Sequence, residues 1–215
     1  MHALDHLLWE EWRLEEGERR FFDLTGVAPA RGGSHSVGGT HNSLLSLGER
    51  AYLELIAPHP THPSGAALPK EAPPEFVPRL FAFAVSGDLN LVERLAIAAG
   101  LTVSLTRGSR RTPEGTLVTW QTAFVKGHAF GASLPFFVRF GGAHHPAQTA
   151  PKGCRLLEFS VGHPHHEALS RLYTALEIGV PVVAAEHPLL RAKLETPKGV
   201  LVLDSREGCR ALPDA

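Results

Sequence analysis

Cysteine is scarce in this 215-residue chain, which contains only Cys154 and Cys209. Two isolated cysteines without C-x-x-C spacing predict free thiols and exclude a disulfide framework or a cysteine-rich zinc site. A nucleophile elbow of the form G-x-S-x-G and a phosphate loop of the form G-x-x-x-x-G-K-[ST] are also missing. The sequence therefore gives no support to nucleophilic catalysis or to nucleotide binding through a phosphate loop.

An excess of charge of one sign is absent as well, since the formal net charge is −1. A nearly neutral chain without a basic tail has no general electrostatic attraction to nucleic acid or to an anionic membrane. The longest apolar runs are far too short to span a bilayer. The acidic, periodic start MHALDHLLWEEWRLEEGERR lacks the zones of a signal peptide. We expect a cytoplasmic protein with neither a nucleic-acid nor a membrane partner.

A strand, a polar break, an amphipathic helix and a glycine recur three times along the chain. The three copies end at Gly26, Gly100 and Gly179, residues that suit helix C-termini, and Asp88 is a plausible N-cap of the second helix. Extended segments follow each glycine. One unit of this length cannot close a core alone, so the repeats predict a single α+β assembly.

The expected organisation follows from these repeats. Residues 1–60 and 78–141 are predicted to form paired βαβββ modules within a region covering 1–150. Residues 151–215 are predicted to form a third, partial unit of structural role that packs on the first two. Proline-rich segments, of which 59–78 is the longer, are expected to be extended connectors.

A carboxylate interrupts the apolar strand pattern RAYLELIAP at residues 50–58. Strand alternation places Glu54 on the face opposite to Leu53 and Leu55. In LDHLLW, the same alternation places His6 on one face of the strand and Asp5, Leu7 and Trp9 on the other. A buried carboxylate needs a compensating partner, so we expect Glu54 to face His6.

Several segments together resemble the vicinal oxygen chelate superfamily, and within it the glyoxalase-like domain group. They are LDHLLW, LTGVAPARGGSHSVGGTHNSLLSLG, AYLELIAP and LPFFVRF followed by HHPAQTAPKGCRL. The resemblance implies repeated βαβββ modules that form a cupped mixed sheet. It also implies a divalent metal, with His6 and Glu54 as ligands and catalytic residues; zinc, nickel, iron and manganese are not distinguished.

The second module departs from the metal-binding pattern of the superfamily. Its first strand, RLFAFAV, has no central histidine or glutamine, and its last strand offers Arg139 where a glutamate is expected. Open catalytic metal sites usually have three protein ligands. The third could come from His41, His128, His144 or His145. The alternative is a buried His6–Glu54 pair without a metal.

Four further residues are candidates for substrate binding. In the glycine-rich stretch GGSHSVGGTHNSLLSLG, His41 and Asn42 are candidates by resemblance, although a polar loop would have the same composition. Trp120 could form an apolar wall or belong to the core. Arg139 suits bidentate binding of a carboxylate or phosphate, or is a surface residue.

These observations predict a glyoxalase-like protein that binds a small, anionic molecule in a cupped sheet. As an enzyme it would be a metal-assisted lyase or isomerase, or a dioxygenase. The alternative is a binding or sequestering protein without turnover. A homodimer is left open.

Overall fold

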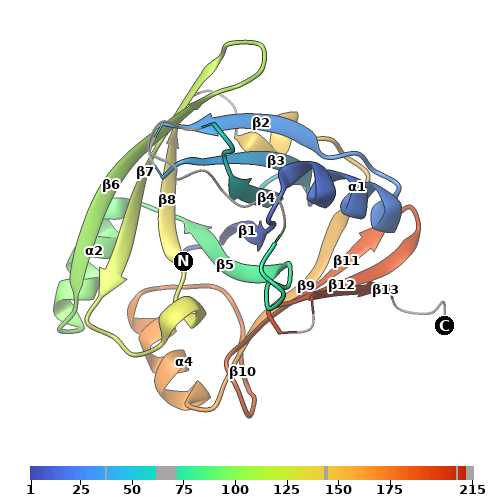
Figure 1. Ribbon diagram of the computed structural model, residues 1–215. Helices are drawn as coiled ribbons and strands as arrows, with labels where there is room; N and C mark the ends of the chain where they lie inside the picture. Colours follow the sequence, from blue (N-terminus) through green and yellow to red (C-terminus); the bar gives the residue numbers. More distant parts are fainter. Residues whose placement is uncertain (37, 62–71, 143–144, 207, 212–215) are drawn as a thin grey trace.

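The chain forms a closed eight-stranded barrel with a second, five-stranded sheet packed outside it (Figure 1). The computed structural model describes residues 1–36, 38–61, 72–142, 145–206 and 208–211. Most of the predicted connector at 59–78, residues 62–71, lies outside the described residues. The mixed α+β class and the cupped sheet predicted from the sequence are confirmed.

The barrel consists of two βαβββ units. The elements of the first are β1 (Leu4–Glu10), α1 (Leu14–Thr25), β2 (Ala30–His35), β3 (Thr40–Ser46) and β4 (Tyr52–Pro58). Those of the second are β5 (Arg79–Ser86), α2 (Leu89–Ala98), β6 (Thr102–Arg111), β7 (Leu117–Lys126) and β8 (Phe136–Gly141). A short 3₁₀ turn, η1 (Gly131–Ser133), precedes β8, and the short helix α3 (Pro146–Thr149) follows it.

Strand order around the barrel is β1-β4-β3-β2-β6-β7-β8-β5. In each unit the first strand runs parallel to the last, so β1 pairs with β4 and β5 with β8. The units join along two seams, β1 with β5 and β2 with β6, both antiparallel. This pairing brings His6 and Glu54 onto neighbouring strands.

The C-terminal unit has a different strand order from the barrel units. It contains β9 (Arg155–His163), α4 (His166–Ala175), β10 (Val182–Ala184), β11 (Leu189–Thr196), β12 (Gly199–Asp204) and β13 (Gly208–Ala211). Its sheet order is β10-β9-β11-β12-β13, so its first strand lies between its second and third. It begins with strand and helix as the barrel units do, but it does not repeat their pairing of first and last strands. The division of the chain at residue 150 stays a prediction.

The predicted helix ends hold for two of the three copies. Gly26 and Gly100 adopt positive φ angles of 78° and 75°, and the Asp88 side chain caps α2 by accepting from the Asn90 amide. The prediction of Gly179 is wrong, because α4 ends at Ala175 and Glu177 takes the left-handed turn with φ 54°. Because the chain turns before Gly179, the Ile178 amide lies next to the end of α4 and donates to the Tyr173 carbonyl.

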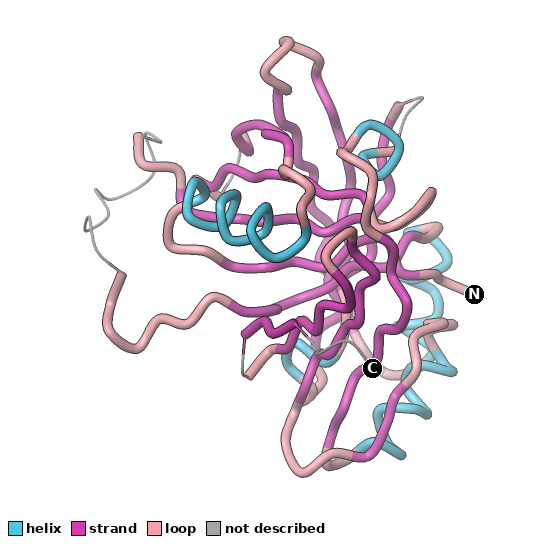
Figure 2. Tube along the Cα trace, turned by 90° about the vertical axis from the view of Figure 1, so that its right-hand side faces the viewer, coloured by secondary structure: helices cyan, strands magenta, loops and turns pink. Residues whose placement is uncertain are grey.

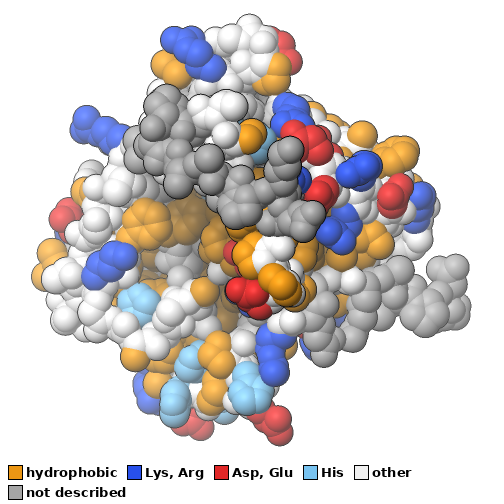
Figure 3. Space-filling view, in the orientation of Figure 1, with side chains coloured by type: hydrophobic (Ala, Val, Ile, Leu, Met, Phe, Trp, Pro, Cys, Tyr) orange, Lys and Arg blue, Asp and Glu red, His pale blue; other side chains and the backbone are white. Residues whose placement is uncertain are grey.

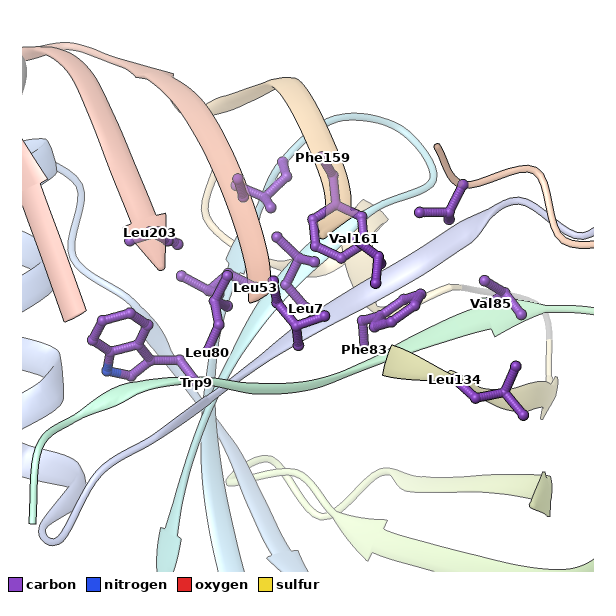
Figure 4. Packing of buried hydrophobic residues seen from close by; sticks show 14 of the residues in the cluster. Leu7, Trp9, Leu53, Leu80, Phe83, Val85, Leu134, Phe159, Val161 and Leu203 are labelled. Atoms are coloured by element: carbon purple, nitrogen blue, oxygen red, sulfur yellow. The ribbon is translucent and has the colours of Figure 1, made fainter. Parts of the chain in front are cut away.

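The main core lies between the outer face of the barrel and the second sheet. Leu7, Trp9, Leu53 and Phe83 are fully buried there, and Figure 4 shows them close to side chains of the second sheet, among them Phe159, Val161 and Leu203. Helices lie on the outside of the strands (Figure 2). Leu7, Leu53 and Leu55 point outward into this core, so the inner face of the barrel carries the alternate residues of β1 and β4.

In the described part of the chain, no helix is both long enough and apolar enough to cross a bilayer.

Leu53→Ala is expected to lower the free energy of unfolding by about 2–5 kcal/mol, because it opens a cavity in a fully buried position. Urea unfolding followed by circular dichroism measures the change. Leu105→Ala is the matched control, since Leu105 is 54% exposed and its loss should cost less than about 0.5 kcal/mol. Equal effects of the two substitutions would contradict the assignment of the barrel's outer face as core.

Candidate functional site

A cavity of about 290 Å³ lies inside the barrel. Its polar side chains come from both units, while β7 and β8 of the second unit supply most of its aromatic wall. The polar residues are His6, His35, Asn42, Glu54, Thr106, Arg107, Arg110 and Thr122, and the aromatic residues are Tyr52, Trp120, Phe124, Phe136 and Phe140. In Figure 3 apolar side chains gather in a hollow on this face of the molecule. The cavity suits a small molecule with one polar and one apolar part.

Glu54 and His6 face each other in this cavity, as strand alternation predicts. Glu54 Oε2 lies 3.5 Å from His6 Nε2, and the two residues are 6% and 3% exposed. Leu53 points the other way into the core. The His6 ring stacks on Tyr52 at 4.6 Å between ring centroids, which fixes its plane. The expected pairing of acid and imidazole is therefore present, and the roles of the two residues stay predictions.

Asp5 departs from the predicted alternation because β1 bulges at this position. In the pairing with β5, Leu4 lies opposite Val85 and His6 opposite Ala84, which leaves Asp5 as the extra residue. A bulge re-aims the side chain of its extra residue. The Asp5 carboxylate lies 2.7 Å from His6 Nδ1. Burial alone would raise the pKa of Asp5, but hydrogen bonds from His145 and His6 outweigh it and lower the pKa.

Asn42 connects Glu54 to His35 on the other side. Its Nδ2 donates to Glu54 Oε1 at 2.7 Å and lies 3.1 Å from His35 Nε2. Burial lowers the pKa of His35, so this imidazole is neutral near pH 7 and accepts from Asn42 through Nε2. Asn42 Oδ1 is buried without a hydrogen-bond partner among the described residues. A Cβ on Gly32 would lie 2.3 Å from this oxygen, so only glycine leaves room for the amide.

Arg110 provides the buried positive charge of the cavity, whereas Arg107, which also lines it, is exposed. It is 7% exposed on β6, and its Nη1 donates to the Gly32 carbonyl of β2. Burial lowers the pKa of Arg110, whereas the nearby Tyr52 and Glu54 raise it. An arginine stays protonated in proteins despite such a shift. Burial raises the pKa of Tyr52 well above its usual range, so Tyr52 is neutral.

Two residues predicted to bind substrate do not line the cavity. Arg139 alternates with the inward Val138 and Phe140, so it is exposed outside the barrel, where its Nη2 donates to Gln121 Oε1 at 2.8 Å. His41 alternates with the inward Asn42 and packs against His59 at 4.9 Å. Burial, with smaller contributions from His59 and Arg31, lowers the pKa of His41 to about 4. The sequence predicted that Arg139 would face the bound molecule. In the structure the buried arginine that lines the cavity is Arg110 of β6.

The other two candidates, Asn42 and Trp120, do line the cavity. Trp120 contacts His35 edge-to-face at 5.6 Å and covers Gly108 of β6, where a Cβ would meet its ring at 2.4 Å. Sequence reasoning missed His35 and Arg110. Gly108 pairs with Trp120 across the β6–β7 hairpin, and Arg110 lies on the same face of β6 as Gly108. Once Trp120 is taken to face the cavity, this alternation would have predicted that Arg110 faces it too.

A resident divalent metal at His6 and Glu54 would need further ligands from the side chains around this pair. The strands of the second unit that face this pair contribute Ala84, Phe136 and Val138, which cannot ligate a metal. The described residues contain no group of three or more histidine, cysteine, aspartate or glutamate side chains arranged to hold a metal ion. His35 Nε2 also lies 3.5 Å from Glu54 Oε1, but it accepts from Asn42. As arranged among the described residues, these side chains do not fit the three-ligand site of a metalloenzyme.

None of the three candidate third ligands that the structure describes completes this site. His128 contacts the Val125 carbonyl, and His145 contacts Asp5. His41 packs against His59. His144 lies outside the described residues.

The architecture defines the class of the protein. Two βαβββ units that enclose a cavity form the fold of the vicinal oxygen chelate superfamily, as the sequence resemblance implied. A family model described as a glyoxalase-like domain matches residues 4–177, so the chain belongs to this family. No curated protein matches the chain.

Solved structures are similar to this chain at low sequence identity, and the first of those below shares its fold. The crystal structure of a hypothetical protein from Staphylococcus aureus has a TM-score of 0.64 and 14% identity, covering 98% of this chain and 88% of that chain. A Mn(II)-bound glyoxalase from Novosphingobium aromaticivorans has a TM-score of 0.47 and 10% identity, with coverages of 98% and 85%. A methylmalonyl-CoA epimerase from Mycobacterium tuberculosis has a TM-score of 0.38 and 16% identity, with coverages of 66% and 88%.

Proposed function

We propose that this protein binds a small organic anion in the barrel and moves a proton on it, as an isomerase or lyase. The observation that carries the proposal is the Glu54–His6 pair beside a buried Arg110 in a cavity with an aromatic wall. Neither the acid nor the imidazole belongs to the hydrophobic core. Burying a carboxylate, an imidazole and a guanidinium around one cavity costs free energy of folding. Such clusters are typical of functional sites.

Arg110 supports the choice of an anion. Its guanidinium is planar and always charged, and it binds carboxylate or phosphate oxygens with two parallel hydrogen bonds. Trp120, Phe124 and Phe136 would contact the apolar remainder of the molecule. This combination favours an organic acid with an aromatic or bulky aliphatic group over a free inorganic anion.

Glu54 is the proposed base. Its carboxylate would remove a proton from the carbon next to a carbonyl group, and the electrons of the C–H bond would move onto the carbonyl oxygen to give an enolate. Arg110 would stabilise the negative charge. Return of the proton to either face of the same carbon completes an isomerisation, a racemisation or epimerisation, without another reactant. His6 Nε2, 3.5 Å from Glu54 Oε2, would exchange the proton with the acid.

Two measurements test this proposal. Binding of phenylacetate, with neutral phenylacetamide as the matched control, is followed by ligand-observed NMR. Exchange of carbon-bound hydrogen for deuterium is followed in D₂O with 2-oxo-4-phenylbutanoate. We expect phenylacetate to bind at least about 10-fold more tightly than the amide, as one charge-assisted contact implies, and exchange to exceed the buffer rate. Equal binding of acid and amide would contradict the role of Arg110.

A metal is not part of the proposed step. We expect dialysis against EDTA to change neither phenylacetate affinity nor exchange rate, because His6 and Glu54 alone form a weak site. Metal analysis of protein purified without chelator, followed by titration with Zn²⁺, Mn²⁺ and Ni²⁺, provides the check. Stoichiometric metal, or activity restored by one of these ions, would instead support the metal-assisted version. The dioxygenase version needs such a metal and is therefore less well supported.

The second candidate function is binding or sequestration without turnover. The alanine and aromatic residues that replace ligands in the second unit favour it. Tight phenylacetate binding with no deuterium exchange would distinguish it from the isomerase. A cytoplasmic location and a homodimer stay predictions from the sequence.

A further inference from the structure

Asp5 is a buried carboxylate that does not line the cavity. It is 2% exposed, and both of its oxygens have histidine partners: Oδ1 lies 2.7 Å from His6 Nδ1, and Oδ2 lies 3.1 Å from His145 Nε2. His6 belongs to the site, whereas His145 comes from the segment before α3, 140 residues away in sequence. A carboxylate between two imidazoles can determine which nitrogen of each carries hydrogen.

The tautomer of His145 follows from its second contact. Its Nδ1 accepts a hydrogen bond from the Ala147 amide at 3.2 Å, as the N-cap of α3. A neutral imidazole that accepts at Nδ1 carries its hydrogen on Nε2. His145 Nε2 therefore donates to Asp5 Oδ2.

Packing holds His145 in this orientation. Its ring lies edge-to-face with Phe140 at 5.3 Å and with Tyr52 at 5.6 Å, so residues from both barrel units contact it. Tyr52 also stacks on His6. The Asp5–His145 pair is thus built into the wall next to His6.

With Asp5 Oδ2 occupied, Oδ1 is left to accept from His6. We propose that Asp5 is a positioning residue that keeps His6 in the tautomer with hydrogen on Nδ1, and that His145 holds the Asp5 carboxylate in place. The Nε2 lone pair of His6 is thereby directed toward Glu54 and the cavity. The tautomer stands independently of the proposed function, and only its consequence for proton transfer rests on that function.

Asp5→Asn provides the decisive variant, because an amide has one acceptor oxygen for two histidine donors. His145, fixed by Ala147, keeps its Nε2 hydrogen and takes the oxygen of the new amide. The amide nitrogen then donates to His6 Nδ1. Because Nδ1 must accept, the neutral His6 ring carries its hydrogen on Nε2. In Asp5→Asn/His145→Leu the oxygen is free again, so His6 should return to the Nδ1–H form.

The experiment records two-bond ¹H–¹⁵N spectra of ¹⁵N-histidine-labelled protein, with the His6 signals assigned from a His6→Gln variant. We expect Nδ1–H in the wild type, Nε2–H in Asp5→Asn, and Nδ1–H in the double variant. His145→Leu alone should keep Nδ1–H. An Asp5→Asn protein with folded circular dichroism and an unchanged His6 tautomer would overturn the positioning role.

Deuterium exchange separates this proposal from the proposed function. We expect Asp5→Asn to reduce exchange of 2-oxo-4-phenylbutanoate about 10- to 100-fold, as for other residues that orient a functional histidine. Phenylacetate affinity should be unchanged and the double variant should recover part of the rate. A switched tautomer with a wild-type rate would overturn the contribution of His6 to catalysis. Absence of exchange in the wild type would refute the proposed function, while the NMR spectra would still test the tautomer.

Discussion

Replacing Glu54 by glutamine is expected to reduce deuterium exchange of 2-oxo-4-phenylbutanoate by about 10²–10⁴-fold, the usual contribution of a general base. The amide keeps the shape of the side chain but cannot accept a proton at pH 7. Asn42 would then face the amide instead of a carboxylate oxygen, so the substitution costs some stability and leaves the barrel intact. Rates and phenylacetate affinity are measured on the same preparation.

Glu158→Gln is the matched control for this experiment. Glu158 lies outside the barrel on β9, where it pairs with Lys193 at 3.4 Å and its side chain is 60% exposed. Its substitution should leave exchange unchanged. If Glu54→Gln retains the wild-type rate while circular dichroism shows a folded protein, the base is elsewhere. His6 and His35, each 3.5 Å from Glu54, are then the alternatives in the cavity.

Arg110→Met is expected to weaken phenylacetate binding about 10- to 100-fold, because it removes a charge-assisted contact of about 1.5–3 kcal/mol. Binding of phenylacetamide should change little. Isothermal titration or ligand-observed NMR gives the affinities, and thermal unfolding checks that the variant is folded. Arg110→Lys keeps the charge without the planar fork, so it should show an intermediate affinity.

Arg139→Met tests the same idea on the outside of the barrel. The sequence pattern pointed to this arginine, yet it pairs with Gln121 and does not reach the cavity. Its substitution should leave phenylacetate affinity within about twofold, a free-energy change of less than about 0.5 kcal/mol. A larger loss for Arg139→Met than for Arg110→Met would contradict the assignment of the cation.

Strand alternation predicted the central pair because one face of β4 is unambiguous. Leu53 and Leu55 could only face a core, so Glu54 had to face something else. The glycines after the first two helices were equally clear, since both need a left-handed backbone. The resemblance to glyoxalase-like domains then predicted which strands meet, which alternation cannot do.

Alternation failed where both faces of a strand are apolar or where the strand is irregular. In β8 the inner Phe136 and Phe140 and the outer Phe137 are all aromatic, so the pattern did not show on which side Arg139 lies. A bulge moved Asp5 beside His6, and nothing in LDHLLW marks that bulge. The partnership of Asp5 with His145 depends on long-range packing that no local pattern contains.

The seam between β2 and β6 has a consequence for how the barrel opens. Among the described residues its strands pair at two positions, Ser34 with Arg111 and His35 with Arg110, against six along the seam of β1 and β5. One further backbone hydrogen bond, from the Ser36 amide to the Ser109 carbonyl, follows them. Local opening of such a short seam costs far less free energy than global unfolding, so its amides should exchange with solvent early. Because Arg110 of β6 also bonds to Gly32 of β2, an anion held by Arg110 would bind the closed seam preferentially. Such a ligand would slow hydrogen exchange here first, which makes these amides a sensitive reporter of occupancy.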